Sequence, residues 1–279
     1  MMTIEGIRQK AAADKVSVSL LFKEQVQLII LDYLFRKGLF SQMVFQGGTA
    51  LRLAYQGVRY SEDLDFVLQK KNAPCFKDMH VLLQPITGHI QKFIPFIKQA
   101  QLKAQKESSS FKRYCLILET DFLPAKDKTN IEIANVPSRR PQTIIIRHAD
   151  MVLSPAVTVE RPEEILSDKL LAFSARDYIK GRDLWDIYFL LNTMKMTLGP
   201  DIVTLLKKKI LDYDMTPKEF LNSLKKRVEA LSTNGTSILR EEMDRFLPGH
   251  YREAFKSQYA DICREQCLIL NQLLEEMKK

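Results

Sequence analysis

Two short segments bring together the residue types that phosphate chemistry requires. Gly47, Gly48 and Thr49 follow an apolar stretch and precede a helical pattern. Glycines let the backbone approach a phosphate, and a helix N-terminus offers unpaired N–H groups to an anion. Asp63 and Asp65 lie two residues apart in a second apolar stretch, so in a strand they share a face where hard cations can bind. This layout predicts phosphoryl or nucleotidyl transfer.

Each segment also has a plainer interpretation. A double glycine is usually only a turn, and the Thr49 hydroxyl could be a simple helix N-cap. An exposed strand edge is the alternative for the acid pair, although Leu64, Phe66 and Val67 argue against exposure. Two acids on one face of an apolar strand repel each other, and such a pair persists best with a cation between them.

A third acid lies in a comparable place. Glu132 stands between Ile131 and Ile133 in a short predicted strand. It could complete a metal site or take the proton from an attacking hydroxyl. A glutamate that faces water from an ordinary alternating strand fits the same pattern.

The C-terminal half adds a lysine and two acids. Lys169 lies among core-type residues, with Arg176 on roughly the same helical face, and a lysine there can balance a triphosphate as a point charge. Asp183 and Asp186 share one helix face, with Arg182 one turn from Asp186. A structural Arg–Asp ion pair is the alternative interpretation.

Hydrophobic periodicity predicts the elements that must position these residues. In chain order they are an amphipathic helix over residues 20–37, a strand at 43–46, a helix at 49–56, a strand at 64–68, a helical stretch at 76–106 with a weak point at Pro85, and strands at 114–120, 130–136 and 144–146. After a proline-plus-acid helix start at residues 161–164 the pattern is helical, with turns near 199–200, 234–235 and 248–249. We therefore predict an α/β (α+β) domain in residues 1–158 and an all-α domain in residues 159–279.

Composition narrows the class of protein. The 279 residues contain too little Gly and Pro for a fibrous or disordered chain. The net charge of +8 favours an anionic partner, nucleic acid first, although single basic runs such as Lys112-Arg113 and Arg139-Arg140 are also typical of solvated faces. The four cysteines lack zinc-type or disulfide-framework spacing. Without a signal peptide or membrane-length run, we expect a reduced, cytoplasmic protein with no membrane partner.

Four segments together resemble the AbiEii/AbiGii toxin family of nucleotidyltransferases, bacterial type IV toxins. The segments are Gly-Gly-Thr-Ala-Leu-Arg, Arg-x-Ser-x-Asp-Leu-Asp-Phe, Asp-Lys-Leu-Leu-Ala and Arg-Asp-Leu-Trp-Asp-Ile, in family order between about Val44 and Leu191. The resemblance implies a polymerase-β-like nucleotidyltransferase core with a mixed sheet, followed by helices. It also implies Mg²⁺ (or Mn²⁺), an NTP as substrate, and an antitoxin that represses transcription without binding the toxin.

The resemblance further implies roles for particular residues. Gly47, Gly48 and Thr49 would bind the nucleotide phosphates, Asp63 and Asp65 would hold magnesium, Lys169 would contact the triphosphate, and Asp186 would support the site. Together with the residue-level arguments, the predicted catalytic residues are Asp63, Asp65, Glu132, Lys169 and Asp186. The predicted metal ligands are Asp63, Asp65 and Glu132. The predicted nucleotide-binding residues are Gly47, Gly48, Thr49, Arg52, Arg59, Ser61 and Lys169.

The function that follows is transfer of a nucleoside monophosphate from an NTP to an acceptor, with release of pyrophosphate. By resemblance and by positive charge, the expected acceptor is RNA, in particular a tRNA 3′ end. Its modification would stop translation, so the protein would act as a growth-inhibiting toxin of a toxin–antitoxin or phage-defence system. Two alternatives remain open: an acceptor that is a protein or a small hydroxylated molecule, and an inactive nucleic-acid-binding module that keeps the fold.

Overall fold

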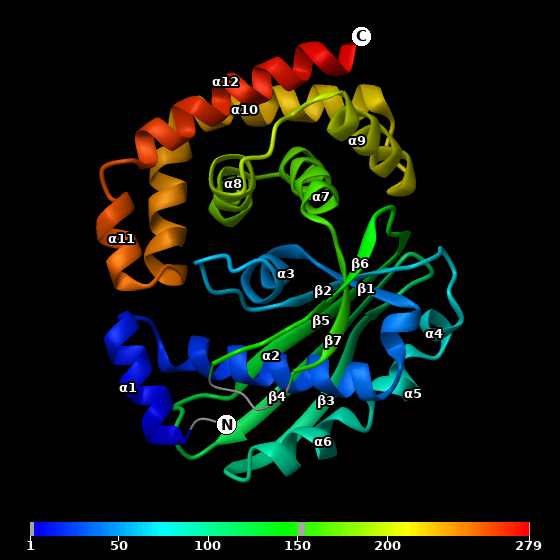
Figure 1. Cartoon of the computed structure of the whole chain (residues 1–279), viewed down its shortest axis with the longest axis vertical. Coiled ribbons are helices and arrows are strands. Elements are labelled where there is room, and N and C mark those ends of the chain that lie inside the picture. The colour runs from blue at the N-terminus through cyan, green and yellow to red at the C-terminus, as the bar shows by residue number, and fades with distance from the viewer. Residues whose placement is uncertain (1–2, 150–153, 279) are drawn as a thin grey trace. The chain divides into compact units, whose positions relative to one another are not determined.

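The computed structural model describes residues 3–149 and 154–278, and the chain divides into two compact units, Met1–Glu160 and Arg161–Lys279. The first unit combines helices with a sheet, and the second is helical (Figure 1). The elements of the first unit are α1 Ile4–Asp14, α2 Val18–Arg36, the 3-10 turn η1 Leu39–Ser41, β1 Met43–Gln46, α3 Gly47–Ala54, β2 Leu64–Leu68, α4 Pro74–Lys77, α5 Met79–Leu83, α6 Ile86–Phe93, β3 Ile97–Glu107, β4 Phe111–Thr120, β5 Asp127–Pro137, β6 Pro141–Ile145 and β7 Ala156–Glu160.

The sheet is mixed, as predicted. Its strand order is β3-β4-β5-β2-β1-β7-β6. The β2–β5 and β1–β7 pairs are parallel, whereas the other neighbours are antiparallel. The two strands that the sequence predicted next to the glycines and acids, β1 and β2, pair directly with each other in the interior of the sheet. Their burial on both faces explains their continuous apolar sequences.

Helix α2 is more deeply buried than an amphipathic helix would be. Fourteen of its 19 residues are buried, including the polar Glu24, Gln25 and Gln27. The helix begins where the Ser17 hydroxyl accepts the N–H of Leu20. Two of its buried polar groups have partners in neighbouring segments: Glu24 pairs with Arg52 of α3, and Gln27 donates to the Ser61 carbonyl.

Residues 97–106 form a strand, so the prediction of a helix through residue 106 was wrong. The helical stretch consists of α4, α5 and α6, of which α6 ends at Phe93. Strand β3 follows and pairs with β4 as the edge strand of the sheet. Its Lys, Gln and Ala residues favour a helix locally. Backbone pairing along β4 outweighs that preference, as tertiary context often does. The serine turn at residues 108–110 was predicted and closes the β3–β4 hairpin, while β7 was not predicted.

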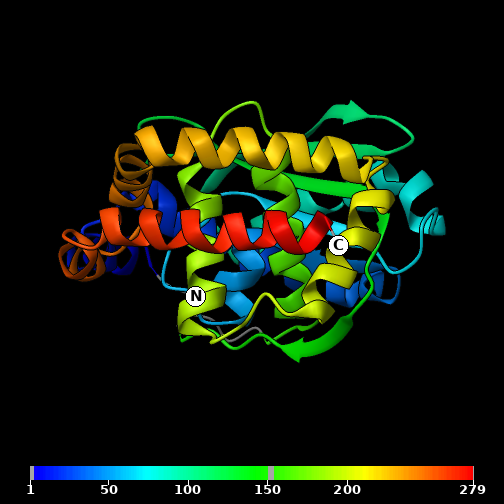
Figure 2. The same ribbon diagram turned by 90° about the horizontal axis from the view of Figure 1, so that it is seen from above.

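The second unit contains only helical elements among residues 161–278, which confirms the predicted all-α character. They are α7 Pro162–Ala175, α8 Gly181–Tyr188, the π-helical turn η2 Phe189–Thr193, α9 Pro200–Asp212, α10 Pro217–Phe246, α11 Gly249–Phe255 and α12 Tyr259–Lys278. Viewed from above, α10 and α12 run side by side (Figure 2). In the two described ranges, no helix has both the length and the apolarity that a membrane crossing demands.

The turn predicted at Asn234-Gly235 is wrong, because α10 continues through it. A Cβ atom on Gly235 would overlap Leu231 and come within 3.4 Å of the Cys263 sulfur on α12. The glycine therefore leaves room for the Leu231 side chain of the same helix and does not change the chain direction.

Candidate active site

The Gly47-Gly48 turn connects β1 to α3 and makes room for two charged side chains. Gly47 has a φ of +79°, a region that L side chains rarely adopt, and a Cβ atom there would overlap the Asp65 carboxylate. A Cβ atom on Gly48 would overlap the Arg59 guanidinium. Gly47 therefore requires glycine, because both its φ and the adjacent carboxylate exclude a side chain, whereas a side chain at Gly48 would displace the Arg59 guanidinium.

Three carboxylates gather on one face of the sheet beside this turn. Asp63 directly precedes β2, and Asp65 is the second residue of β2. Parallel pairing places Glu132 of β5 opposite Asp65, so their side chains point to the same face. Asp63 follows on that face by the two-residue period of a strand. All three are partly exposed, and the strand register that the sequence could not supply brings Glu132 to the acid pair.

Two side chains of the first unit hold Asp63 in place. The amide Nδ2 of Asn130 donates to Asp63 Oδ1 over 3.0 Å, and the buried Thr49 hydroxyl donates to the Asp63 backbone carbonyl. Thr49 is not the helix N-cap, because α3 begins at Gly47 and its N-cap is Gln46. In this structure Thr49 orders the loop that carries the first acid.

A cation lies beside the third acid. Arg113 Nε is 2.8 Å from Glu132 Oε1, and antiparallel pairing places the two residues opposite each other on β4 and β5. Glu132 therefore does not simply face water, which was the plainer interpretation of its strand. Glu132 lies between Asp65 on β2 and Arg113 on β4. One face of the sheet therefore carries three acids followed by a basic residue.

The side chains of Arg52, Arg59 and Ser61, which were predicted to bind nucleotide, occupy different environments. Arg59 and Ser61 are buried; Arg59 Nη1 donates to the Tyr60 carbonyl over 2.9 Å. Arg52 points instead to Glu24 of α2, with Nε 2.7 Å from Oε2, and its guanidinium lies 4.1 Å from the centre of the Tyr60 ring. Arg59 thus lies against the glycine turn, whereas Arg52 connects α3 to α2.

Helices α7 and α8 bring the predicted lysine and acids of the second unit together. Lys169 Nζ lies 3.1 Å from Asp183 Oδ1 and 2.7 Å from Asp186 Oδ2. Arg176 Nε lies 2.9 Å from Asp183 Oδ2. Burial by itself would raise the pKa of Asp183, but the charges of Lys169 and Arg176 outweigh it and lower that pKa. Arg182, one turn from Asp186, pairs with Glu242 of α10 instead.

The family model for the nucleotidyltransferase AbiEii toxin of type IV toxin–antitoxin systems matches residues 29–265. The chain belongs to the AbiEii family. It is therefore a nucleotidyltransferase of a toxin family, and the predicted resemblance and enzyme class are confirmed. No curated protein matches the sequence.

Solved structures agree with the AbiEii fold. A candidate nucleotidyltransferase from H. pylori is similar with a TM-score of 0.52 and 21% identity, covering 94% of this chain and 98% of the other. JHP933 from Helicobacter pylori is similar with a TM-score of 0.51 and 21% identity, covering 94% and 95%. At this identity the likeness shows the fold, and it extends over both units of the AbiEii chain.

Sequence reasoning missed several residues that organise this AbiEii site. Asn130 and Arg113 contact the acids but lie in alternating strands that give no motif. Glu24 lies in a polar stretch of α2, next to Lys23 and Gln25, that gives no motif. Only the strand register and the packing of α2 reveal these partners.

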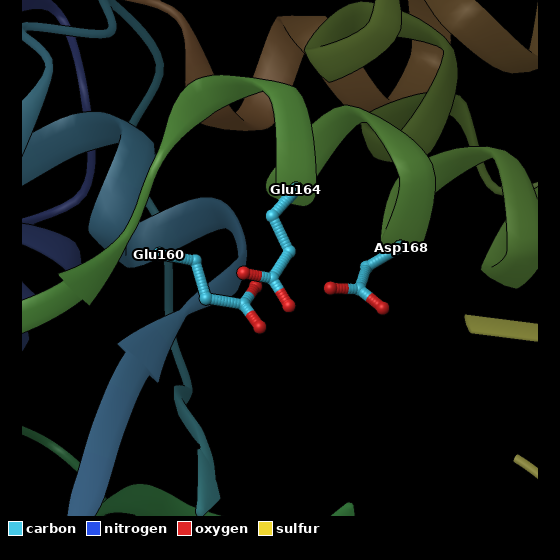
Figure 3. Close-up of side chains that lie close together, drawn as sticks. All are labelled: Glu160, Glu164 and Asp168. Carbon is cyan, nitrogen blue, oxygen red and sulfur yellow. The ribbon is translucent and has the colours of Figure 1, made fainter. Parts of the chain in front are cut away.

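A buried charge cluster on α7 was also missed. Lys209 of α9 is fully buried, with Nζ 2.7 Å from Glu164 Oε1 and 3.0 Å from Asp168 Oδ2. Figure 3 shows these two carboxylates on successive turns of α7, drawn together with Glu160, the last residue of β7. A buried lysine between Glu164 and Asp168 joins α7 to α9 of this AbiEii chain.

Proposed function

We propose that this nucleotidyltransferase transfers a nucleoside monophosphate from an NTP to the 3′ end of an RNA, in a reaction that depends on Mg²⁺. The observation that carries the proposal is the row of acids Asp63, Asp65 and Glu132 beside the Gly47-Gly48 turn. Phosphate-approachable backbone next to clustered carboxylates supports phosphoryl-type transfer.

The donor set fits a hard divalent cation. Asp63, Asp65 and Glu132 offer only carboxylate oxygens, which Mg²⁺ and Mn²⁺ prefer, and no soft ligand lies among them. Because Gly47 has no Cβ atom, the Asp65 carboxylate can lie directly against the turn. When bound, the metal would neutralise triphosphate charge and lower the pKa of the acceptor hydroxyl.

The residues of the first unit would then divide the work. The backbone at Gly47 and Gly48 would take the nucleotide phosphates, with Arg59 and Ser61 supporting the turn. Glu132 would take the proton from the acceptor hydroxyl or share the metal. Thr49 would hold the loop that carries Asp63, since its hydroxyl is hydrogen-bonded to that residue's carbonyl.

Lys169 would supply positive charge for the triphosphate, and Asp186 would orient it. The ion pair of Lys169 with Asp186, 2.7 Å long, restricts the side chain to one region. A pre-ordered lysine loses less entropy on binding an anion than a free one does. Arg52, whose guanidinium is engaged with Glu24, would act on the α2–α3 contact more than on the nucleotide.

The net charge of +8 supports an RNA acceptor. Transfer onto a tRNA 3′ end would stop translation and explain growth inhibition by a toxin of this family. The antitoxin would then act without direct binding, as the family resemblance implies.

The test is incubation of the purified protein with each labelled NTP, Mg²⁺ and total cellular RNA. We expect a labelled RNA band and pyrophosphate release, both lost in Asp63→Ala and Asp65→Ala and retained in the control Asp78→Ala, which changes an exposed acid before α5. Label found on a protein or on a small molecule would show that this molecule, and not RNA, is the acceptor. No label and no pyrophosphate with any acceptor would overturn the proposed activity.

A further inference from the structure

Cross-strand pairing extends the row of acids outward into basic residues. Gln46, Asp65 and Glu132 are paired across β1, β2 and β5. The same row continues to Arg113 on β4 and Lys106 on β3. Directly paired residues share a face of the sheet. One face therefore carries acids at the predicted transfer site and cations over the two outermost strands beside it.

A bulge in β3 adds a second lysine to this face. Lys103 pairs with Cys115 and Lys106 pairs with Arg113, with a register shift between Ala104 and Lys106. Residues three apart in a regular strand point to opposite faces, but one extra residue returns them to the same face. Both lysines are exposed. The bulge thus gathers two cations where a regular strand would present one.

An aromatic ring lies between the cations. Lys106 Nζ is 5.5 Å and the Arg113 guanidinium carbon 5.6 Å from the centre of the Phe111 ring. Phe111 is two residues before Arg113 on β4, so it shares the same face, and it is partly exposed. A ring that can stack a base, flanked by cations that can take phosphates, is the arrangement that single-stranded nucleic acid requires.

The neighbouring acid is turned away from this face. Glu107 accepts the Tyr114 hydroxyl over 2.6 Å and lies 3.5 Å from Lys112 Nζ. Lys112 is buried and also donates to the Lys77 carbonyl. These contacts place Glu107 and Lys112 on the opposite face, and positive charge therefore dominates around Phe111.

We infer that Phe111, Arg113, Lys106 and Lys103, the Phe111 strip, bind the terminal nucleotides of a single-stranded RNA acceptor, with one base stacked on Phe111. The inference rests on the proposed function for its direction toward the acids. From β5 to β3 the strip crosses two strand spacings, about 10 Å, which matches roughly three nucleotides at a stacked rise of about 3.4 Å.

Binding of a fluorescein-labelled single-stranded RNA, followed by anisotropy at several salt concentrations, tests the strip without any transfer reaction. Phe111→Leu should weaken binding roughly 5- to 100-fold without changing the salt dependence, because stacking is not ionic, and Phe111→Tyr should restore it. Lys103→Glu/Lys106→Glu should make the negative slope of log affinity against log salt less steep by about 1.4, which is about 0.7 for each lost phosphate contact.

The matched control is Lys70→Glu/Lys71→Glu, which reverses two exposed charges beyond the other end of β2. It should leave both affinity and salt slope close to wild type. Circular dichroism of every variant identifies any that fails to fold, and the exposed lysine pair allows the test even if Phe111→Leu does not fold.

Three results would overturn the inference: wild type that binds no single-stranded RNA, strip variants that bind like the control, or duplex RNA bound equally well with no effect of Phe111→Leu. The transfer assay separates this from the proposed function. If the strip variants label RNA with an unchanged KM for RNA, the Phe111 strip does not bind the acceptor, although the proposed transfer activity stands. RNA binding through the strip without any transfer would refute the activity alone.

Discussion

At the scale of single residues, the proposed chemistry depends on how closely the backbone at Gly47 approaches the Asp65 carboxylate. Asp65 lies against Gly47 on one side and opposite Glu132 on the other. Like charges at this spacing raise the free energy of the metal-free site, and a bound cation would relieve that cost. The glycine is required because any side chain would displace the acid from the row.

Gly47→Ala should therefore lower both stability and activity, and Gly38→Ala is its matched control. Both glycines have positive φ, +79° and +67°, but nothing lies within 4 Å of a Cβ atom on Gly38. The control should lose only the backbone term, about 1–2 kcal/mol in the free energy of unfolding. Gly47→Ala should lose roughly 3 kcal/mol because the overlap with Asp65 adds to it. Chemical denaturation and NTP turnover measure both, and equal losses in the two variants would contradict the role of Asp65.

At the scale of elements, an ion pair connects helix α2 to helix α3, which follows the glycine turn. Glu24 on α2 pairs with Arg52 on α3, and its Oε1 lies 3.2 Å from His148 Nε2. Burial alone would raise the pKa of Glu24, but the hydrogen bond with His148 and the charge of Arg52 outweigh it and lower the pKa from 4.5 to about 2. The buried, charged Glu24 thus joins α3 to α2.

This pair predicts a pH dependence of stability. Because the folded-state pKa of Glu24 is depressed, its stabilising effect is present above pH 4.5 and is lost as pH falls toward about 2. The lost free energy is about 3 kcal/mol, from the shift at roughly 1.4 kcal/mol per pKa unit. Glu24→Gln should lack this fall in unfolding experiments at stepped pH. The control Glu253→Gln, which changes an exposed glutamate of α11, should keep the wild-type curve. A wild-type curve in Glu24→Gln would contradict the assignment.

Helices α7 and α8 supply the second prediction at this scale. Lys169→Ala should lower the unfolding free energy by about 3 kcal/mol, because the buried Asp183 and Asp186 lose their shared cation. It should also raise the KM for NTP. Arg176→Ala, whose side chain is 36% exposed, should cost about 1 kcal/mol or less. If Lys169→Ala is destabilised but keeps its NTP titration, the lysine is structural and does not bind nucleotide.

At the scale of the whole molecule, the acids and glycines belong to one unit and the lysine and its acids to the other. The family match extends across both, over residues 29–265. If the proposed transfer causes growth inhibition, the effect on growth should depend on Asp63 and Asp65 rather than on the presence of folded protein.

Induced expression should therefore arrest growth for the wild type and not for Asp63→Ala/Asp65→Ala. The double variant removes two like charges from one face, so its melting temperature should equal or exceed that of the wild type. Colony counts after induction, with soluble protein matched by immunoblot, measure the effect. Arrest by the double variant at equal expression would show that toxicity does not run through transfer.

The basic runs show where sequence proximity misleads. Lys112 and Arg113 are adjacent in sequence, yet Lys112 is buried on one face of β4 and Arg113 lies beside Glu132 on the other. Arg139 and Arg140 lie beyond the C-terminal end of β5, and its last residue, Pro137, is already five residues, or roughly 17 Å of strand, from Glu132. The pair that looked like one cluster is divided by the two-residue period of the strand.

Strands β1 and β2, the glycine turn, the Asp63–Asp65 pair and the helical character of the second unit could all be predicted from the amino-acid sequence. Each rests on local chemistry: apolar runs, glycine, proline and spacing within a few residues. Tertiary structure alone decided that residues 97–107 form a strand, that Glu132 lies opposite Asp65, and that Arg113 and Phe111 flank the site. These depend on which strands pair and in what register, and pairing between residues tens of positions apart leaves no periodic signal in a single sequence.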